Sequence, residues 1–220
     1  KDYPIRQELQ SRHETRVVVD NDANAQALAE FKFGVGVGYD NQVFITISSG
    51  IGAGVIANGK IYRGATGTAG EVGHMIVEPQ SKIKCRCGNY GCLMSLASGI
   101  GLKQIWQQYL DEGYQSGIAL NMEDKASTID GIILKKGLES GDELAKMVVE
   151  KCAEYIGIGL YNVFQLLNPG LFVLGGGLSN LGDALIGKVQ YHFQRLAQNM
   201  MYEDVPIKLS QLGEDAGLIG

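Results

Sequence analysis

The stretch AGEVGHMIVEPQSKIKCRCGNYGC (69–92) places one histidine and three cysteines close together in the sequence. These four residues are His74, Cys85, Cys87 and Cys92. Imidazole and thiolate groups are ligands that Zn²⁺ prefers, and four of them complete a tetrahedral shell. The glycines between the last two cysteines permit the tight turns of a metal loop. The stretch therefore predicts a zinc site, and Glu71 adds a carboxylate close to it.

The composition is that of a soluble globular protein. The chain has 220 residues, of which 45% are hydrophobic and 20% charged, and it is long enough to bury a core. Its net charge of −5, without a Lys/Arg stripe, argues against a nucleic-acid-binding surface. No apolar run approaches the roughly 20 residues of a membrane span, and residues 1–10 do not resemble a signal peptide. Because three of the four cysteines are clustered, we expect free thiols, bound metal and a cytoplasmic protein.

Hydrophobic periodicity predicts an α/β protein. The expected helices span residues 5–13, 25–33, 93–110, 127–138, 143–167 and 183–198. The expected strands span residues 16–19, 42–48, 55–57, 60–62, 171–174 and 207–212. The three strands within 42–62 are joined by tight turns and predict an antiparallel meander, whereas helices and strands alternate later in the chain. This order is typical of a ribonuclease-H-like sheet with helices packed on its faces.

Polar residues occupy the junction between the expected strand 16–19 and the next helix. The sequence there is Asp20-Asn21-Asp22-Ala23-Asn24. One such residue is enough to cap a helix, so the others are available for catalysis or binding. From the residues alone, a helix cap and a catalytic role for Asp22 are about equally supported.

The 31 glycines gather at a few places where the backbone must turn sharply or approach a ligand. Residues 49–54 (SGIGAG) are expected to form a turn whose bare N–H groups can cradle phosphate, although glycine-rich hairpins are often only hairpins. Gly175-Gly176-Gly177 follows an apolar strand, where a simple strand-to-helix turn is an equally good interpretation.

Several of these motifs occur together, in order, as they do in one known family. They are Asn21-Asp22-Ala23-Asn24, Ser48–Gly54, Gly70-Glu71-Val72-Gly73-His74, the CxCGxxGC element at 85–92, and Asn168-Pro169 followed by Gly175–Gly177. The chain resembles the ROK family (repressor, open reading frame, kinase), which includes glucokinases and sugar-responsive repressors. The resemblance covers nearly the whole chain and implies an actin-like ATPase fold of two lobes.

The resemblance implies a role for each motif. Asp22 would be the general base that deprotonates the sugar hydroxyl, with Asn21, Glu71 and His74 as sugar-binding residues. Backbone at Ser49, Gly50 and Gly52 would contact phosphate, and Gly175, Gly176 and Gly177 would lie beside adenosine. His74, Cys85, Cys87 and Cys92 would hold a structural Zn²⁺, because four protein ligands leave no open position. ATP and Mg²⁺ would be required by a kinase.

The resemblance also implies a domain organisation and an assembly. Residues 1–23 would end the N-terminal lobe and form the crossover, and residues 24–220 would form the C-terminal lobe with a zinc loop at 74–92. The family's opening phosphate loop, of the type Asp-x-Gly-x-Thr, does not occur, so the chain is expected to be a fragment. The implied ligand is a hexose, and the implied assembly is a homodimer or homotetramer. No direct contact with nucleic acid and no contact with a membrane are expected.

The chain departs from the family next to Cys92, the last cysteine of the cluster. The family places a glutamate that contacts the sugar two residues after this cysteine, and this chain has Met94 there. Loss of that acceptor is expected to weaken or redirect sugar binding by about 1.5–3 kcal/mol. Asp22 favours an ATP-dependent hexose kinase, because a sensor needs no base. Met94 favours the alternative, the sugar-sensing domain of a transcriptional repressor whose DNA-binding segment lies outside this chain.

Overall fold

A five-stranded mixed sheet organises the computed structural model, which describes residues 3–118, 129–198 and 205–220. The strands lie in the order β3-β2-β1-β4-β5. They are β1 (Gln42–Ile47), β2 (Ile51–Ala57), β3 (Lys60–Tyr62), β4 (Leu171–Gly175) and β5 (Ile207–Leu209). The first three pair antiparallel, and β4 and β5 add in parallel on the other side of β1. The predicted α/β class and the meander are confirmed.

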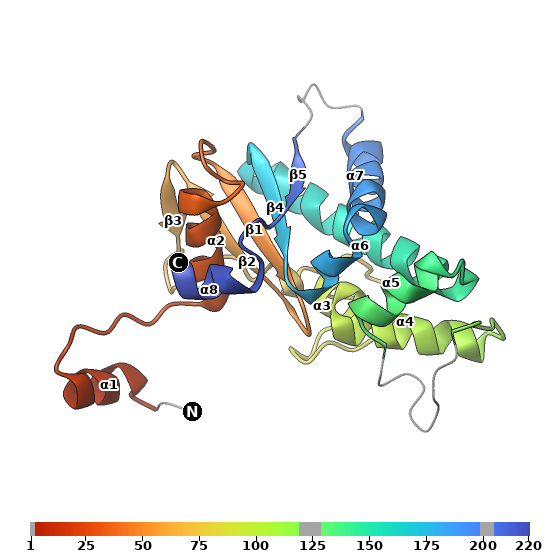
Figure 1. Cartoon of the computed structure of the whole chain (residues 1–220), viewed down its shortest axis with the longest axis horizontal. Helices are drawn as coiled ribbons and strands as arrows, with labels where there is room; N and C mark the ends of the chain where they lie inside the picture. The colour runs from red at the N-terminus through yellow and green to blue at the C-terminus, as the bar shows by residue number, and fades with distance from the viewer. Residues whose placement is uncertain (1–2, 119–128, 199–204) are drawn as a thin grey trace.

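Eight α-helices complete the described part of the chain (Figure 1). They are α1 (Ile5–His13), α2 (Asp22–Phe33), α3 (Leu93–Ala97), α4 (Gly99–Asp111), α5 (Gly131–Glu139), α6 (Glu143–Leu167), α7 (Asp183–Ala197) and α8 (Ala216–Ile219). Three 3₁₀ turns are η1 (Val72–His74), η2 (Gly177–Leu181) and η3 (Gly213–Asp215). None of the helices in the described ranges is long and apolar enough to cross a membrane.

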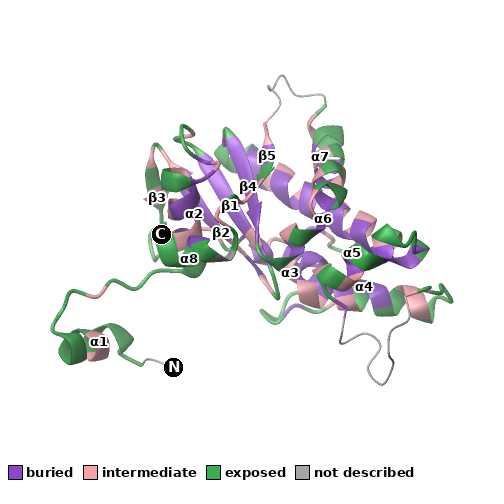
Figure 2. Ribbon diagram, in the orientation of Figure 1, coloured by how far each residue is buried: buried purple, intermediate pink, exposed green. Residues whose placement is uncertain are grey.

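The two faces of the sheet are buried by different helices. Alternate residues such as Ile45, Ile51 and Leu174 point into the main core, which also contains the apolar faces of α3, α4, α6 and α7. Their neighbours, such as Phe44 and Val173, point to the opposite face and pack with Ala27 of α2. Figure 2 shows the resulting buried strands at the centre of the molecule. The period-2 alternation of the strands thus separates two apolar clusters across one sheet.

Helix α6 meets α7 closely because its interior glycines provide space. A methyl group added at Gly157 would lie 2.6 Å from His192 Cβ and 3.1 Å from the backbone nitrogen of Phe193. Asn168, in the left-handed conformation with φ 43°, ends α6 as predicted. Cys152 is fully buried in α6, which confirms it as a small core residue.

Five predicted elements differ from the structure. Residues 16–19 form an exposed extended segment rather than a buried strand, because no described strand lies beside them; Val18 is 67% exposed. Ile51 to Gly54 belong to β2, so the turn is shorter than predicted. The helix expected at 93–110 is broken at Ser98, whose side chain caps α4. The last strand ends at Leu209, and α5 begins at Gly131; residues 119–128 lie outside the described residues.

The cap of α6 makes a testable contribution to stability. Asp142 Oδ1 accepts from the backbone of Ala145 at 2.8 Å, and Oδ2 accepts from Gly117 N at 2.6 Å, Ser116 Oγ at 2.8 Å and Ile118 N at 3.2 Å. Asp142→Ala should lower the free energy of unfolding by about 2–4 kcal/mol, because it leaves four donors without this acceptor. Denaturant titration measures this, with Asp130→Ala at the exposed cap of α5 as a control expected to cost about 1 kcal/mol.

The contribution of Asp142 should depend on pH. Burial raises its pKa, but the hydrogen bonds from Ala145, Ser116, Gly117 and Ile118 outweigh burial and hold the pKa below the ordinary value of 3.8. A lowered pKa in the folded state means that the stabilisation is complete above the unfolded-state pKa and is lost as the pH falls through the folded-state pKa. The difference in stability between wild type and Asp142→Ala should therefore shrink below about pH 4. A difference that stays constant to pH 2 would contradict this assignment.

Candidate functional site

The segments that carry the predicted site residues pack beside the first half of β2. The first turn of α2 crosses β2 so closely that a methyl group added at Gly54 would lie 2.4 Å from the carbonyl oxygen of Ala23. Gly52 faces the same helix turn, with Ala23 Cβ 3.6 Å from its added-methyl position. These two bare positions let α2 begin directly over the strand. The side chains of Asn21 and Asp22 are consequently held at this end of the sheet.

The segment that leads into residues 74–92 covers the part of the β2 edge that β3 leaves unpaired. Gly70 has a φ of 91°, and its carbonyl accepts from Ala53 N at 3.0 Å. A methyl group added at Gly73 would lie 2.2 Å from the carbonyl oxygen of Ile51. Glu71 and His74 are therefore brought to the strand that also supports the first turn of α2. The structure thus gathers Asn21, Asp22, Glu71 and His74 around β2.

Asn21 and Asp22 are exposed at the start of α2. Asn21 Oδ1 accepts from Ala23 N at 2.9 Å, which makes Asn21 the helix cap, and Asp22 Oδ1 accepts from the same N–H at 2.9 Å. Asp22 is the first residue of the helix, where the positive end of the helix dipole favours a carboxylate. The capping function belongs to Asn21, so the Asp22 carboxylate remains available to a ligand.

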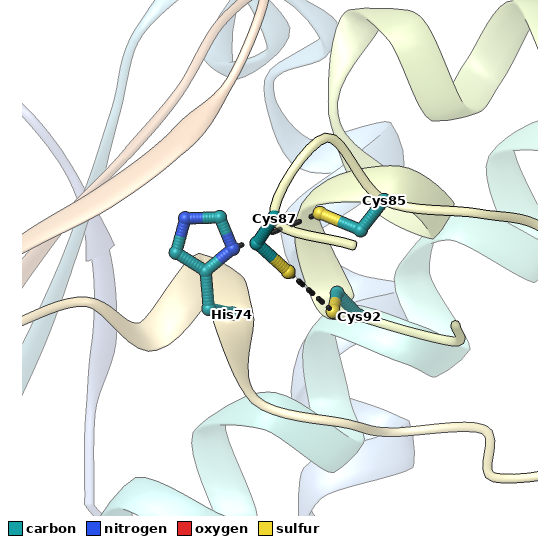
Figure 3. A group of neighbouring side chains, drawn as sticks. All are labelled: His74, Cys85, Cys87 and Cys92. Carbon is teal, nitrogen blue, oxygen red and sulfur yellow. Dashed lines mark hydrogen bonds between the residues drawn. The ribbon is translucent and has the colours of Figure 1, made fainter. Parts of the chain in front are cut away.

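The four candidate zinc ligands converge on one point (Figure 3). Their ligand atoms all lie within 4.8 Å of one another, with 3.7 Å between Cys85 Sγ and His74 Nδ1 and 3.7 Å between Cys87 Sγ and Cys92 Sγ. Zn–S bonds of about 2.3 Å in a tetrahedron place two sulfurs about 3.8 Å apart. The spacing and the donor set therefore fit Zn²⁺.

The local fold of the loop supports this convergence. Ile76 pairs with Cys92 and Lys84 with Tyr90 in isolated antiparallel bridges, and Cys85 N donates to Asn89 O at 2.7 Å. Cys85 and Cys92 are buried, whereas Cys87 is exposed. His74 turns Nδ1 toward the cysteines, and its Nε2 lies 3.9 Å from Glu71 Oε2. One ring nitrogen can thus hold the metal while the other faces Glu71 and the outside.

The thiols of the cluster have different proton affinities. A backbone hydrogen bond at Asn89, together with the neighbouring thiols and His74, lowers the pKa of Cys87 to about 7. Burial and the adjacent Cys87 and Cys85 thiols raise the pKa of Cys92 to about 12. A metal that binds all three sulfurs must therefore displace protons, chiefly from Cys92.

A cavity of about 310 Å³ lies beside the Ser48–Gly50 turn. Its walls come from that turn, the starts of α4 and α5, and η2 after β4. The lining residues are Ser48, Ser49, Gly99, Ile100, Leu102, Lys103, Ile129, Asp130, Gly131, Ile132, Gly177, Leu178 and Asn180. The turn approaches α4 directly, because Gly99 N donates to Ser48 O at 2.7 Å. An apolar cavity with a few polar groups at its rim is typical of a small-molecule site.

The predicted nucleotide-binding residues divide into two groups. Ser49 and Gly177 line the cavity, and Gly50 adjoins it in the turn. Gly52, Gly175 and Gly176 are instead explained by close packing against neighbouring parts of the chain. A methyl group at Gly175 would lie 2.6 Å from Phe44 Cζ, and one at Gly176, where φ is 85°, would lie 2.5 Å from Ile47 O. A nucleotide contact at these three glycines stays a prediction.

The apolar wall of the cavity was missed by sequence reasoning. Ile132 and Leu178 lie far from Ser49 in the sequence and carry no motif of their own, so no signal in the sequence indicated them.

Met94 lies between the turn and the Glu71–His74 segment. Its Cε is 3.6 Å from a methyl group added at Gly50 and 3.0 Å from one added at Gly73. The side chain is half-buried. The position that departs from the family is therefore adjacent to both the candidate phosphate turn and the candidate sugar-binding residues.

Comparison with known proteins identifies relatives along the whole chain. The "ROK family" model matches residues 1–220. A glucokinase of Halalkalibacterium halodurans is 36% identical over 220 residues, which cover all of this chain and 66% of that enzyme. This chain thus spans slightly less than two thirds of that relative.

Two solved structures extend the comparison. A ROK glucokinase from Streptomyces griseus, in complex with glucose and AMPPNP, matches with a TM-score of 0.86 and 32% identity over 98% of this chain and 70% of that one. A ROK transcriptional regulator, a homologue of the E. coli MLC protein, matches with a TM-score of 0.87 and 30% identity over 98% of this chain and 53% of that one. The expected actin-like ATPase fold is confirmed by this likeness. The chain belongs to the ROK family.

Proposed function

We propose that this chain carries the catalytic base and sugar-binding residues of an ATP-dependent hexose kinase. The observation that carries the proposal is that the backbone next to Asp22, at Ala23, and the backbone next to Glu71 and His74, at Gly70 and Gly73, both contact the first half of β2. The similarity to a glucokinase over all 220 residues supports it. The S. griseus relative, which binds glucose and AMPPNP, supports hexose and ATP as the substrate classes.

In the proposed mechanism, each residue performs one task. Asn21, Glu71 and His74 Nε2 hydrogen-bond the hydroxyls of the sugar and orient one of them toward the γ-phosphate. The Asp22 carboxylate accepts the proton of that hydroxyl as the oxygen attacks the γ-phosphorus of ATP, and the bond from this phosphorus to the β–γ bridging oxygen breaks to release ADP. The adenosine occupies the cavity beside Ser49 and Gly177, with phosphates along the Ser48–Gly50 turn. Mg²⁺ bound to the nucleotide phosphates would neutralise part of their charge, and no residue of this chain is assigned to it.

The proposed Zn²⁺ is structural. With four protein ligands it has no open position for substrate. It would hold Nδ1 of His74, which fixes the ring and presents Nε2 to the sugar. The metal therefore acts on the reaction through the orientation of His74.

A second candidate function is a sugar-sensing domain of a ROK transcriptional regulator. The structural match to such a regulator and the presence of Met94 favour it. Coupled assays of the full-length protein with Mg²⁺-ATP and glucose, N-acetylmannosamine or fructose separate the two functions. Turnover above an Asp22→Ala control supports the kinase. Calorimetric sugar binding without turnover supports the sensor.

Met94 offers a test of sugar affinity. Met94→Glu should lower the KM for hexose about 10-fold to 100-fold, because a carboxylate beside Gly50 and Gly73 supplies a charged acceptor for sugar hydroxyls. Met94→Leu is the control, since it keeps an apolar side chain of similar volume and should leave the KM nearly unchanged. Steady-state kinetics across several hexoses measure the effect. An equal change in both variants would show that packing rather than hydrogen bonding governs this position.

A further inference from the structure

The start of α2 follows a segment that is not held by the sheet. Residues 14–21 form neither helix nor strand and are mostly exposed. Figure 1 shows α1 at the end of this arm, away from the body of the molecule. Because Asn21 and Asp22 come directly after the arm, their position depends on what fastens the arm where it meets α2.

The Asp20 carboxylate anchors the arm at the start of α2, and both of its oxygens accept hydrogen bonds. Oδ1 accepts from Asn21 N at 2.8 Å and from Asn24 Nδ2 at 2.9 Å. Oδ2 accepts from Arg63 Nε at 2.9 Å and Nη2 at 2.5 Å. Burial opposes ionisation, but the bonds from Arg63, Asn24 and Asn21 lower the pKa of Asp20. The carboxylate thus stays charged at neutral pH and holds four hydrogens at once.

Arg63 connects this carboxylate to the other half of the site. It follows β3 directly, and its carbonyl accepts from Ala69 N at 3.1 Å, which closes the loop that leads to Gly70. Gly70 in turn is bonded to Ala53 of β2, and Glu71 comes next. A continuous set of contacts therefore joins the start of α2 to the Glu71–His74 segment.

We propose that Arg63 and Asp20 are positioning residues that hold Asp22 at a fixed position relative to Glu71 and His74, independently of the conformation of the arm. An exposed ion pair usually contributes little to stability. Its value here is geometric, because Asp22 lies two residues from the clamped carboxylate. A displacement of about 1 Å in a catalytic group can cost about 100-fold in rate. The inference rests on the proposed kinase activity for its kinetic consequence and on the contacts alone for its structural one.

Arg63→Met and Lys60→Met make a matched pair in the full-length protein. Both remove one positive charge and introduce the same side chain, and Lys60 is exposed on the strand that ends just before Arg63. Arg63→Met should lower kcat about 10-fold to 100-fold, leave the KM for ATP within about twofold, and speed amide hydrogen exchange at residues 21–26. Lys60→Met should match wild type in all three measurements.

Two further variants keep the test decisive. Arg63→Lys retains the charge but only one donor group, so its kcat should be intermediate. Asp20→Asn retains an acceptor for Asn24, whose buried amide would otherwise lose its partner. Combined with Arg63→Met, it should lower kcat no further than the more affected single variant, since both act through one contact.

Each outcome either supports or overturns the proposed positioning role of the clamp, which is the ion pair between Asp20 and Arg63. A kcat of Arg63→Met within twofold of Lys60→Met, with unchanged exchange at 21–26, overturns the proposal. If Arg63→Met does not fold, Arg63→Lys decides by the same two measurements. If wild type phosphorylates no hexose, the kinase proposal fails, and the exchange comparison of Arg63→Met with Lys60→Met still supports or overturns the clamp.

Discussion

Asp22→Asn should lower kcat for hexose phosphorylation about 100-fold to 10,000-fold, with a much smaller change in the KM for sugar. General base catalysis contributes this range, and the substitution removes the proton acceptor while keeping the size of the side chain. The helix should survive, because the cap is Asn21 and not Asp22. Coupled assays with several hexoses, accompanied by thermal unfolding, separate a catalytic loss from a folding loss.

Asp183→Asn is the matched control for this prediction. Asp183 is also an exposed first residue of a helix, α7, which packs on the opposite face of the sheet from α2. Any loss of helix-dipole stabilisation should be similar in the two variants, at about 0.3–1 kcal/mol. A wild-type kcat for Asp22→Asn would exclude Asp22 as the base. An equal loss of kcat in both variants would assign the effect to helix stability.

The sequence predicted most of the fold because its strands and long helices carry strong periodic signals. The apolar run at 171–174 is β4, and the Asn58-Gly59 turn has φ values of 51° and 72°, which suit a two-residue hairpin. The error at 16–19 has a clear cause. A β-branched run predicts a strand only where another strand can pair with it, and local sequence does not report the neighbour.

The candidate site was only partly predictable for the same reason. The four candidate zinc ligands are close in sequence, so their spacing identified them, and the structure brings their ligand atoms together. The clamp between Asp20 and Arg63 joins residues 43 positions apart, and neither belongs to a motif that reasoning from the sequence singled out as paired. The extent of the turn at Ser48–Gly50 was overestimated because glycines in β2 serve the close approach of α2 rather than a loop.

Cys85→Ser should abolish stoichiometric zinc binding and lower the melting temperature by several degrees. Cys85 is one of the four residues whose ligand atoms lie within 4.8 Å of one another, and structural zinc in small domains contributes about 10–16 kcal/mol of apparent binding energy. Only part of this will appear as lost stability, because most of the main core comes from the sheet and the helices, and the loop adds Val77 with Met75 and Ile83 packed beside it. Elemental analysis should give about one zinc per wild-type chain and almost none per variant.

Cys152→Ala is the control for this variant. Cys152 is fully buried and lies outside the cluster, so its replacement should leave the zinc content at the wild-type level while costing about 1 kcal/mol of stability. Retention of zinc by Cys85→Ser would contradict the assignment of this ligand. Wild-type protein that contains no zinc, without exposure to chelator, would contradict the site as a whole.

Acid should release the metal even from wild type, and the thiols set the direction of the effect. Zinc binds thiolates, and in the metal-free fold burial raises the pKa of Cys92 to about 12. Every proton that zinc displaces at this sulfur returns more readily as the pH falls, so the apparent affinity must decrease with falling pH. Because His74 is both a candidate zinc ligand and a candidate sugar contact, loss of zinc should raise the KM for sugar before the sheet unfolds. Parallel measurement of zinc release, sugar KM and thermal unfolding between pH 8 and pH 5 tests this order, and simultaneous loss of all three would mean that the loop is inseparable from the core.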